Sequence, residues 1–333
     1  KFQNLNDIMP GKRFEFRDVS FLVISLFIGV ILIKLFVFSN EKDPGYFERF
    51  LEKYGIFALD LPAEISFAGE RVPMENFDVA ESLDKELLIN TYWQSQTVLF
   101  LKKANRFFPV IEPILKENNI PDDFKYIALI ESGLENSVSP SGAKGYWQFL
   151  EGTAKEYGLE VNKEVDERYH LVKSTEAACR YFAKAYEKFN NWTVAAASYN
   201  MGRTNIIRQI NRQKSDNYYD LVLGDETGRY IYRILAVKLI LENPENYGFN
   251  LRDNDLYEPI PTYKVKIDST INDFADFAKN YNINYKILKY FNPWLRDNQL
   301  KNPARKSYLI DIPEKSVSRS FTFIDTLSID SIN

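Results

Sequence analysis

The sequence predicts a mainly α-helical chain that carries a small βααβ module near its C-terminal end. Apolar side chains recur at helical spacing almost throughout residues 82–242. Residues 263–313 instead begin and end with short β-type runs, "TYKVKI" and "KSYLIDIP", on either side of two short helical patterns. A third observation, a long apolar run near the N-terminus, adds a predicted transmembrane helix.

Residues 19–38 form this apolar run, which only two serines, a glycine and Lys34 interrupt. A helix of this length spans the bilayer core, which is about 30 Å thick. Basic residues precede the run and acidic residues follow it, so residues 1–18 are expected in the cytoplasm and the rest of the chain outside it. A cleaved signal peptide is the alternative, but the run is too long and lacks a small-residue cleavage site. We therefore predict an uncleaved, single-pass anchor.

The composition excludes several classes of function. The chain has 333 residues, with 42 basic and 46 acidic side chains and a net charge of −4. A nucleic-acid partner would require a basic face, so none is expected. One cysteine and one histidine cannot supply a disulfide framework or a zinc or haem site, so we expect no metal and no cofactor.

The single histidine and the single cysteine could form a thiol dyad. Cys179 lies in "STEAACRYFAKAY", however, which is a strongly helical run. A free cysteine in such a run is usually a small buried apolar residue. We therefore interpret Cys179 as part of the core and do not assign His170 a catalytic role.

The patterns divide the exported part of the chain into successive segments. An irregular lead-in is followed by a helical domain, in which we expect one helix over residues 83–108 and a second, shorter one over 108–120. A linker rich in Asn and Pro precedes the module, and a polar tail ends the chain. The predicted segments are 41–84 (lead-in), 85–245 (helical domain), 246–261 (linker), 262–313 (module) and 314–333 (tail).

A glutamate occupies an apolar stripe in the stretch "PDDFKYIALIESGLENS". Phe124, Ile127 and Ala128 recur at i, i+3 and i+4, and the next position on that stripe is Glu131. Gly133 then supplies a helix stop. A glutamate at a helix end can simply reach solvent, but one held in an apolar wall resists ionisation and can act as an acid near neutral pH. Cleavage of a glycosidic bond needs such an acid.

A glycine-containing loop, "GAKGYWQF", follows this helix. We expect Gly142 and Gly145 to let the backbone approach a bulky ligand, with Tyr146 and Trp147 as aromatic surfaces and Gln148 as an amide. Two glycines at this spacing are also common in ordinary turns, so this loop alone does not identify a site.

A third stretch, "VAAASYNMG", reads as a helix whose alanines permit close packing. Tyr199 and Asn200 end it before Gly202. Asn and Gly at these positions can equally be helix-termination residues. This stretch alone is also ambiguous.

Together these stretches resemble the lysozyme-like domain of lytic murein transglycosylases, glycoside hydrolase family 23, and especially its membrane-bound members. The resemblance covers residues 85–245 and rests on "ESGLENSVSPSGAKGYWQF", "AAASYNMG" and "ETGRYIYRILAVK" in that order. It implies a lysozyme-like helical fold and places Glu131 on the family's catalytic acid. The positions that it matches to substrate-binding residues are Ser132, Ser139, Gln148, Tyr199, Asn200 and Tyr230.

The resemblance also implies an activity. Glu131 would protonate the oxygen between N-acetylmuramic acid and N-acetylglucosamine, and the muramic acetamide would assist. The same residue would then act as a base on the muramic C6 hydroxyl, so that a 1,6-anhydro end forms. The implied partner is a peptidoglycan strand, and the implied location is the bacterial inner membrane with the catalytic domain in the periplasm. The alternatives are a hydrolytic lysozyme of the same fold and a non-catalytic peptidoglycan-binding protein.

The C-terminal module resembles a LysM domain, which is a βααβ unit that binds N-acetylglucosamine chains. The match includes Asn292 after the second helix, whereas the usual Gly-Asp before the first helix is replaced by Ile267-Asp268. The resemblance implies glycan binding. The alternative is a small packed domain without a ligand.

Overall fold

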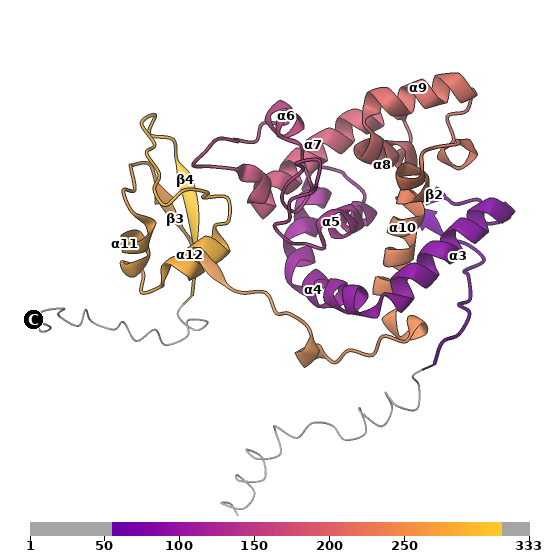
Figure 1. Ribbon diagram of the computed structural model, residues 1–333, viewed down its shortest axis with the longest axis horizontal. Coiled ribbons are helices and arrows are strands. Elements are labelled where there is room, and N and C mark those ends of the chain that lie inside the picture. Colours follow the sequence, from indigo (N-terminus) through magenta and orange to yellow (C-terminus); the bar gives the residue numbers. More distant parts are fainter. Residues whose placement is uncertain (1–54, 315–333) are drawn as a thin grey trace, which may run out of the picture. The chain divides into compact units, whose positions relative to one another are not determined.

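The computed structural model describes residues 55–314 (Figure 1). The predicted cytoplasmic segment, the anchor at residues 19–38 and residues 315–333 of the tail lie outside the described residues. Within the described part, no helix is long and apolar enough to cross a membrane. The elements discussed below belong to one compact unit that begins at Ala58.

The unit is mainly helical, as the sequence predicts. A short antiparallel hairpin, β1 (Ser66–Phe67) and β2 (Glu70–Arg71), precedes the helices. The helices are α3 (Phe77–Tyr92), α4 (Gln94–Glu117), α5 (Lys125–Ser132), α6 (Glu151–Glu156), α7 (Leu171–Phe189), α8 (Trp192–Met201), α9 (Arg203–Gln213) and α10 (Asp225–Glu242).

The main core forms where α10 packs against α3, α5 and α8. Helix α8 carries three consecutive alanines, Ala195, Ala196 and Ala197, which are all fully buried. These small side chains allow the neighbouring helices to approach closely. Helix α5 contacts both α4 and α10 (Figure 1), so its C-terminal end is held from two sides.

The predicted break between the first two helices is wrong in position. The chain turns at Trp93, between α3 and α4, while Pro109 and Pro113 both lie inside α4. A buried hydrogen bond from the Thr97 hydroxyl to the Asn90 carbonyl braces this turn. No glycine or proline marks residues 90–97, so the local sequence gives no sign of the turn.

The helical core begins before the predicted boundary at residue 85. Helix α3 starts at Phe77, and Phe67, Val72 and Val79 are buried in the main core. The hairpin also caps α8, because the Glu70 carboxylate accepts hydrogen bonds from the backbone N–H groups of residues 192 and 193, at 2.6 and 2.8 Å. Much of the segment predicted as an irregular lead-in is therefore part of the folded core.

The C-terminal module has the predicted βααβ order. Strands β3 (Thr262–Ile267) and β4 (Tyr308–Pro313) pair antiparallel, and α11 (Phe274–Lys279) and α12 (Tyr285–Phe291) lie between them in the chain. The buried Asn292 joins α12 to β4, because its amide donates to the Asp311 carbonyl at 2.7 Å and accepts from the Asp311 N–H at 2.8 Å. This side chain therefore has a structural role.

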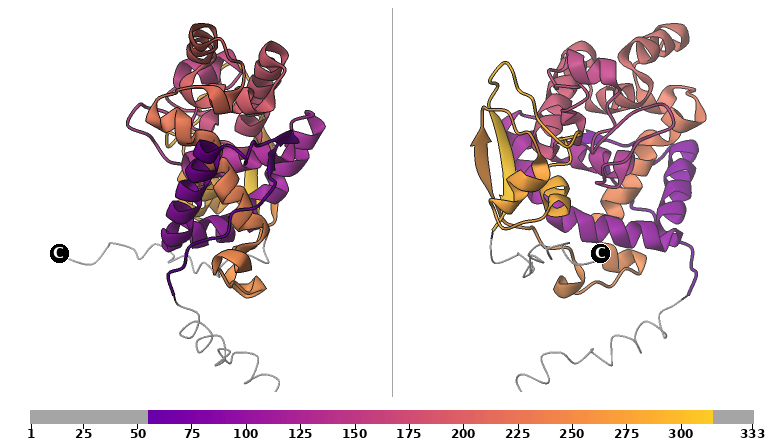
Figure 2. Two further views of the ribbon diagram at one scale, coloured as in Figure 1. Left: turned by 90° about the vertical axis from the view of Figure 1, so that its right-hand side faces the viewer. Right: turned by 60° about the vertical axis from the view of Figure 1, so that its left-hand side comes forward.

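The module packs against a loop that connects α6 to α7 (Figure 2). Asp166 N–H donates to the Trp294 carbonyl at 2.9 Å, and Arg296 N–H donates to the Glu164 carbonyl at 2.7 Å. Val165 and Tyr169 from this loop are buried in the module's own core. The module and the helical part therefore share apolar packing as well as backbone hydrogen bonds.

Candidate active site

The end of helix α5 presents Glu131. Phe124, Ile127 and Ala128 are fully buried and form the predicted stripe, while Glu131 itself is partly buried one turn further on. Gly133 ends the helix in the left-handed conformation, with φ at 62°, which costs glycine little. The stripe thus holds the glutamate at the last turn of a short, rigid helix.

The Glu131 carboxylate receives a hydrogen bond from helix α10. The Tyr230 hydroxyl donates to Glu131 Oε1 at 2.6 Å. Tyr230 is buried, and burial is the main reason that its pKa lies well above the usual value for tyrosine. This hydroxyl therefore keeps its proton and acts only as a donor towards the glutamate.

The pKa of Glu131 is raised to about 7, and the largest cause is its burial. The hydrogen bond from Tyr230 and the positive charge of Arg233 lower it, whereas the negative charge of Glu226 raises it further. A carboxyl group with this pKa is present in both protonation states near neutral pH, as a group that gives and takes a proton requires.

The glycine-containing loop is held against this glutamate from two helices. Ser132 Oγ, next to Glu131, donates to the Tyr146 carbonyl at 2.8 Å. The Tyr199 hydroxyl, at the end of α8, donates to the Trp147 carbonyl at 2.6 Å. Gln148 binds within the loop, where its amide donates to Ser137 Oγ at 3.0 Å and to the Gly145 carbonyl at 2.8 Å.

Two expectations for this loop are wrong. A Cβ at Gly145 would lie 1.9 Å from the Arg168 carbonyl oxygen, so the close approach that requires glycine there is to the protein's own backbone. Trp147 is fully buried and donates through Nε1 to Thr175 Oγ1 at 2.9 Å, so it belongs to the core and offers no aromatic surface to a ligand. Tyr146 is also buried except for a small exposed edge.

Asn200 binds side chains at the start of α10, whereas Ser139 binds within its own turn. Asn200 is bound to the start of α10, because its amide donates to Glu226 Oε1 at 3.1 Å and its oxygen accepts from Thr227 Oγ1 at 2.7 Å. Since the charge of Glu226 acts on Glu131, Asn200 lies in the same electrostatic neighbourhood. Ser139 accepts from the Ala143 N–H at 3.0 Å within its own turn.

Helix α3, which packs against α10, carries a buried acid that is not among the residues predicted from the sequence. Glu86 is 1% exposed, and Arg229 Nε donates to its Oε1 at 2.5 Å. Arg233 Nε lies 3.9 Å from the other Glu86 oxygen, and its charge also lowers the pKa of Glu131. The sequence does contain a sign of this acid. Arg229 and Arg233 stand four residues apart in "GRYIYR", so they lie on one face of the helix, where two positive charges call for a carboxylate partner.

Cys179 and His170, which the sequence offered as a possible thiol dyad, do not have the properties of a reactive pair. Cys179 is buried, and burial raises its pKa to about 12. Burial also lowers the pKa of His170 to about 3, so this imidazole is neutral at physiological pH. These properties match the interpretation of Cys179 as a small apolar residue of the core.

Comparisons with known proteins support both resemblances. Residues 108–222 match the family model "Transglycosylase SLT domain", and residues 263–316 match "Soluble lytic transglycosylase C-terminal LysM-like domain". The first match contains Glu131, Gln148, Tyr199 and Asn200, whereas Tyr230 lies beyond its end. The predicted resemblance to lytic transglycosylases with a LysM-like module is therefore confirmed.

The chain is also similar to membrane-bound lytic murein transglycosylase D from two strains of Escherichia coli. The identity is 28% over 244 residues, which cover 71% of this chain and 52% of each relative. The chain thus spans about half the length of these curated relatives. A solved structure of an inactive mutant of the lytic transglycosylase Slt from Pseudomonas aeruginosa matches 45% of this chain and 26% of its own, with 18% identity and a TM-score of 0.35.

Proposed function

We propose that the chain is a peptidoglycan lytic transglycosylase, in which Glu131 is the only catalytic carboxylate. One observation carries this proposal: a partly buried glutamate whose pKa is raised to about 7 receives a 2.6 Å hydrogen bond from Tyr230. Glu131 lies within the match to the transglycosylase family model, whereas Tyr230 lies just beyond its end. The bond that we propose to be cleaved is the β-1,4 linkage between N-acetylmuramic acid and N-acetylglucosamine.

The first step uses Glu131 as an acid. Because Tyr230 donates to Oε1, the transferable proton resides on Oε2. That proton passes to the glycosidic oxygen while the bond from this oxygen to C1 of the muramic residue breaks. The oxygen of the muramic acetamide bonds to C1 as the glycosidic bond breaks, so no second carboxylate is required.

The second step uses the same residue as a base. The ionised Glu131, which Tyr230 stabilises through its hydrogen bond, accepts the proton of the muramic C6 hydroxyl. The C6 oxygen then bonds to C1 and displaces the acetamide, which gives a 1,6-anhydro end and restores the protonated glutamate. No water is consumed.

The other predicted residues divide into two proposed roles. Ser132 and Tyr199 hold the loop that contains Gln148, so they position this loop beside the acid. We propose that Gln148, Asn200 and Ser139 bind the sugars through their amide and hydroxyl groups. Tyr230 acts directly on the carboxylate.

Mass spectrometry of muropeptides distinguishes the proposed activity from its alternatives. Purified sacculi treated with the protein should release products that are one water lighter than the corresponding lysozyme products. Products of the full mass would show hydrolysis. Binding to sacculi without any release would show a non-catalytic binding protein.

Replacing Tyr230 with Phe should shift the pH dependence of cleavage. The hydrogen bond from Tyr230 lowers the pKa of Glu131, so its loss raises that pKa above about 7. A bond to a charged group contributes about 1.5–3 kcal/mol, which corresponds to about one pKa unit or more. Because the acid must be protonated, the alkaline limb of the rate profile should move to higher pH, while the maximal rate falls about tenfold. Rates measured from pH 4 to 9 check this.

The matched control for this prediction is Tyr232→Phe. Tyr232 lies two residues along the same helix and is also buried, but its hydroxyl neighbours Ser82 and not Glu131. This variant should keep the wild-type profile. An unchanged alkaline limb in Tyr230→Phe would contradict the assignment of this tyrosine to the catalytic acid.

We propose that the protein is anchored in the inner membrane through residues 19–38 and that its catalytic part lies in the periplasm, where the module binds glycan chains. The apolar run and the preceding basic residues support this location, as do the names of the Escherichia coli relatives. Full-length protein should sediment with membranes, and protease should reach it only after the outer membrane is opened. Recovery of the full-length protein in the cytoplasmic fraction would contradict the anchor.

A further inference from the structure

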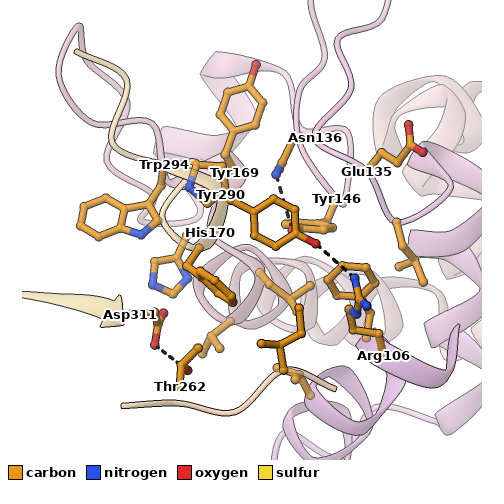
Figure 3. A pocket seen from close by; sticks show the side chains of 18 of the residues that line it. Arg106, Glu135, Asn136, Tyr146, Tyr169, His170, Thr262, Tyr290, Trp294 and Asp311 are labelled. Carbon is orange, nitrogen blue, oxygen red and sulfur yellow. Dashed lines mark hydrogen bonds between the residues drawn. The ribbon is translucent and has the colours of Figure 1, made fainter. Parts of the chain in front are cut away.

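A cavity of about 580 Å³ lies between helix α4, the loop after α5 and the C-terminal module (Figure 3). Glu131 is not among its lining residues. Aromatic rings form part of its wall and come from both the helical part and the module, among them Tyr146, Tyr169, His170, Tyr257, Tyr290 and Trp294. Its volume is that of a site for a small organic ligand.

The walls of the cavity are held in place by backbone hydrogen bonds. The linker lies along α4, where Tyr257 N–H donates to the Lys102 carbonyl at 3.2 Å. Arg106 Nε donates to the Glu258 carbonyl at 2.9 Å. On the other side, the loop that contains Tyr169 packs in the core of the module. The cavity is therefore formed before any ligand binds.

A buried donor in this wall has no acceptor. Trp294 is 2% exposed, and its indole Nε1 has no hydrogen-bond partner among the described residues. Figure 3 draws this nitrogen on the side of the indole ring that faces His170. An indole N–H can only donate, and leaving such a group buried without an acceptor is costly. A ligand with an acceptor oxygen would satisfy it.

The cavity also has an excess of positive charge. Its two acidic side chains are each paired with a lysine, Glu135 with Lys103 and Asp311 with Lys264. Two further cations, Arg106 and Lys289, form no ion pair with a carboxylate among the described residues.

These two cations still have N–H groups to offer. Arg106 Nη1 donates to the Tyr290 hydroxyl at 3.1 Å, and Lys289 Nζ donates to the Leu295 carbonyl and, at 2.8 Å, to the Asp297 carbonyl. The guanidinium has five N–H donors and the ammonium has three, so Arg106 keeps three donors and Lys289 keeps one for a ligand anion.

We propose that this cavity binds a short peptide with free carboxylates. The carboxylates pair with Arg106 and Lys289, a peptide carbonyl accepts from the Trp294 indole, and the aromatic rings cover the apolar parts of the chain. A neutral sugar would stack on the rings but would leave both cations without a counter-charge.

The position of the cavity indicates which peptide it takes. Glu135 and Asn136 line it and follow Glu131 by only a few residues, and the lining residue Tyr146 is bonded through its carbonyl to Ser132. A strand bound at Glu131 would therefore carry its peptide side chain towards the cavity. The identification of the ligand as the peptide of a peptidoglycan strand rests on the proposed function. The inference that the cavity binds carboxylates does not depend on that function.

Calorimetry with the full-length protein in detergent tests the proposal. The probe is the tripeptide L-alanyl-γ-D-glutamyl-diaminopimelate, and the neutral comparison is the tetramer of N-acetylglucosamine. Wild-type protein should bind the tripeptide. Arg106→Gln should weaken this binding at least about tenfold, because a charge-assisted hydrogen bond is lost. Val110→Trp should abolish tripeptide binding, because Val110 lines the cavity and the indole ring of tryptophan would fill it.

Each variant has a matched control on the same helix. Lys116→Gln removes a charge from α4 away from the cavity, and Leu99→Trp adds a ring at a position that is 39% exposed, similar to the 37% of Val110. Both controls should bind the tripeptide as the wild type does.

Three results would overturn the proposal. The first is no tripeptide binding by the wild type, and the second is tripeptide binding that survives both Arg106→Gln and Val110→Trp. The third is a Val110→Trp variant that loses binding of the neutral sugar but keeps binding of the tripeptide. Release of anhydro products from sacculi is measured in parallel. Absence of tripeptide binding by the wild type, with release of anhydro products retained, would contradict only the cavity, and tripeptide binding without any cleavage would contradict only the proposed function.

Discussion

Glu131→Gln should lose glycan cleavage by a factor on the order of 10² or more, the loss expected when a general acid is removed. Glutamine keeps the size of the side chain, and its amide oxygen can still accept the hydrogen bond that Tyr230 donates at 2.6 Å. It has no proton to transfer at neutral pH. The variant should therefore fold and bind sacculi but leave the glycosidic bond intact.

The same substitution should change how stability depends on pH. The folded pKa of Glu131, about 7, lies above the value of 4.5 expected for an unfolded chain. Between these values the folded state holds more protons than the unfolded state, so wild-type stability falls as pH rises through this window. The cost reaches at most about 3 kcal/mol above pH 7. Since glutamine does not titrate, the variant should become more stable than the wild type as pH rises from 5 to 8.

Two measurements check these expectations. Release of anhydro muropeptides reports the activity, and thermal unfolding at several pH values reports the stability. Glu151→Gln is the control, because Glu151 is an exposed glutamate that pairs with Lys155 on the surface of α6. This control should alter neither quantity. Cleavage by Glu131→Gln at close to the wild-type rate would mean that the glutamate only ends a helix.

Local patterns were sufficient for much of the fold around the glutamate. The apolar stripe of Phe124, Ile127 and Ala128, together with the stop at Gly133, predicts helix α5 and the place of Glu131 on it. The order of β-type and helical runs in residues 263–313 likewise predicts the βααβ module. In each case the spacing of side chains within one short segment carries the information.

Features that depend on distant residues could not be predicted in this way. The turn at Trp93 is braced by a hydrogen bond between Thr97 and Asn90 and has no breaker residue. The aromatic ring of Trp147 reads as a ligand surface until Thr175, on another helix, is seen to accept its N–H. The packing of the module against the loop that contains Tyr169 has no local signature either.

Gly145→Ala should be the most destabilising single substitution in the loop beside Glu131. The backbone of Gly145 has φ at 79°, and a Cβ there would lie 1.9 Å from the Arg168 carbonyl oxygen. A backbone atom cannot move aside by changing a rotamer, so the loop itself must shift. We expect the free energy of unfolding to fall by about 4 kcal/mol or more, a loss found only where a specific steric or strain mechanism operates.

Gly142→Ala separates this steric cost from the cost of backbone conformation. Gly142 has almost the same φ, 84°, but nothing lies within 4 Å of its added Cβ. Its variant should lose only the conformational cost of about 1–2 kcal/mol. Since Ser132 and Tyr199 bind the carbonyls of the two residues that follow Gly145, a shift of this loop should also reduce cleavage in Gly145→Ala while Gly142→Ala remains active. Equal melting temperatures for the two variants would contradict the close contact with Arg168, because the two glycines have nearly the same φ and only Gly145 has this contact.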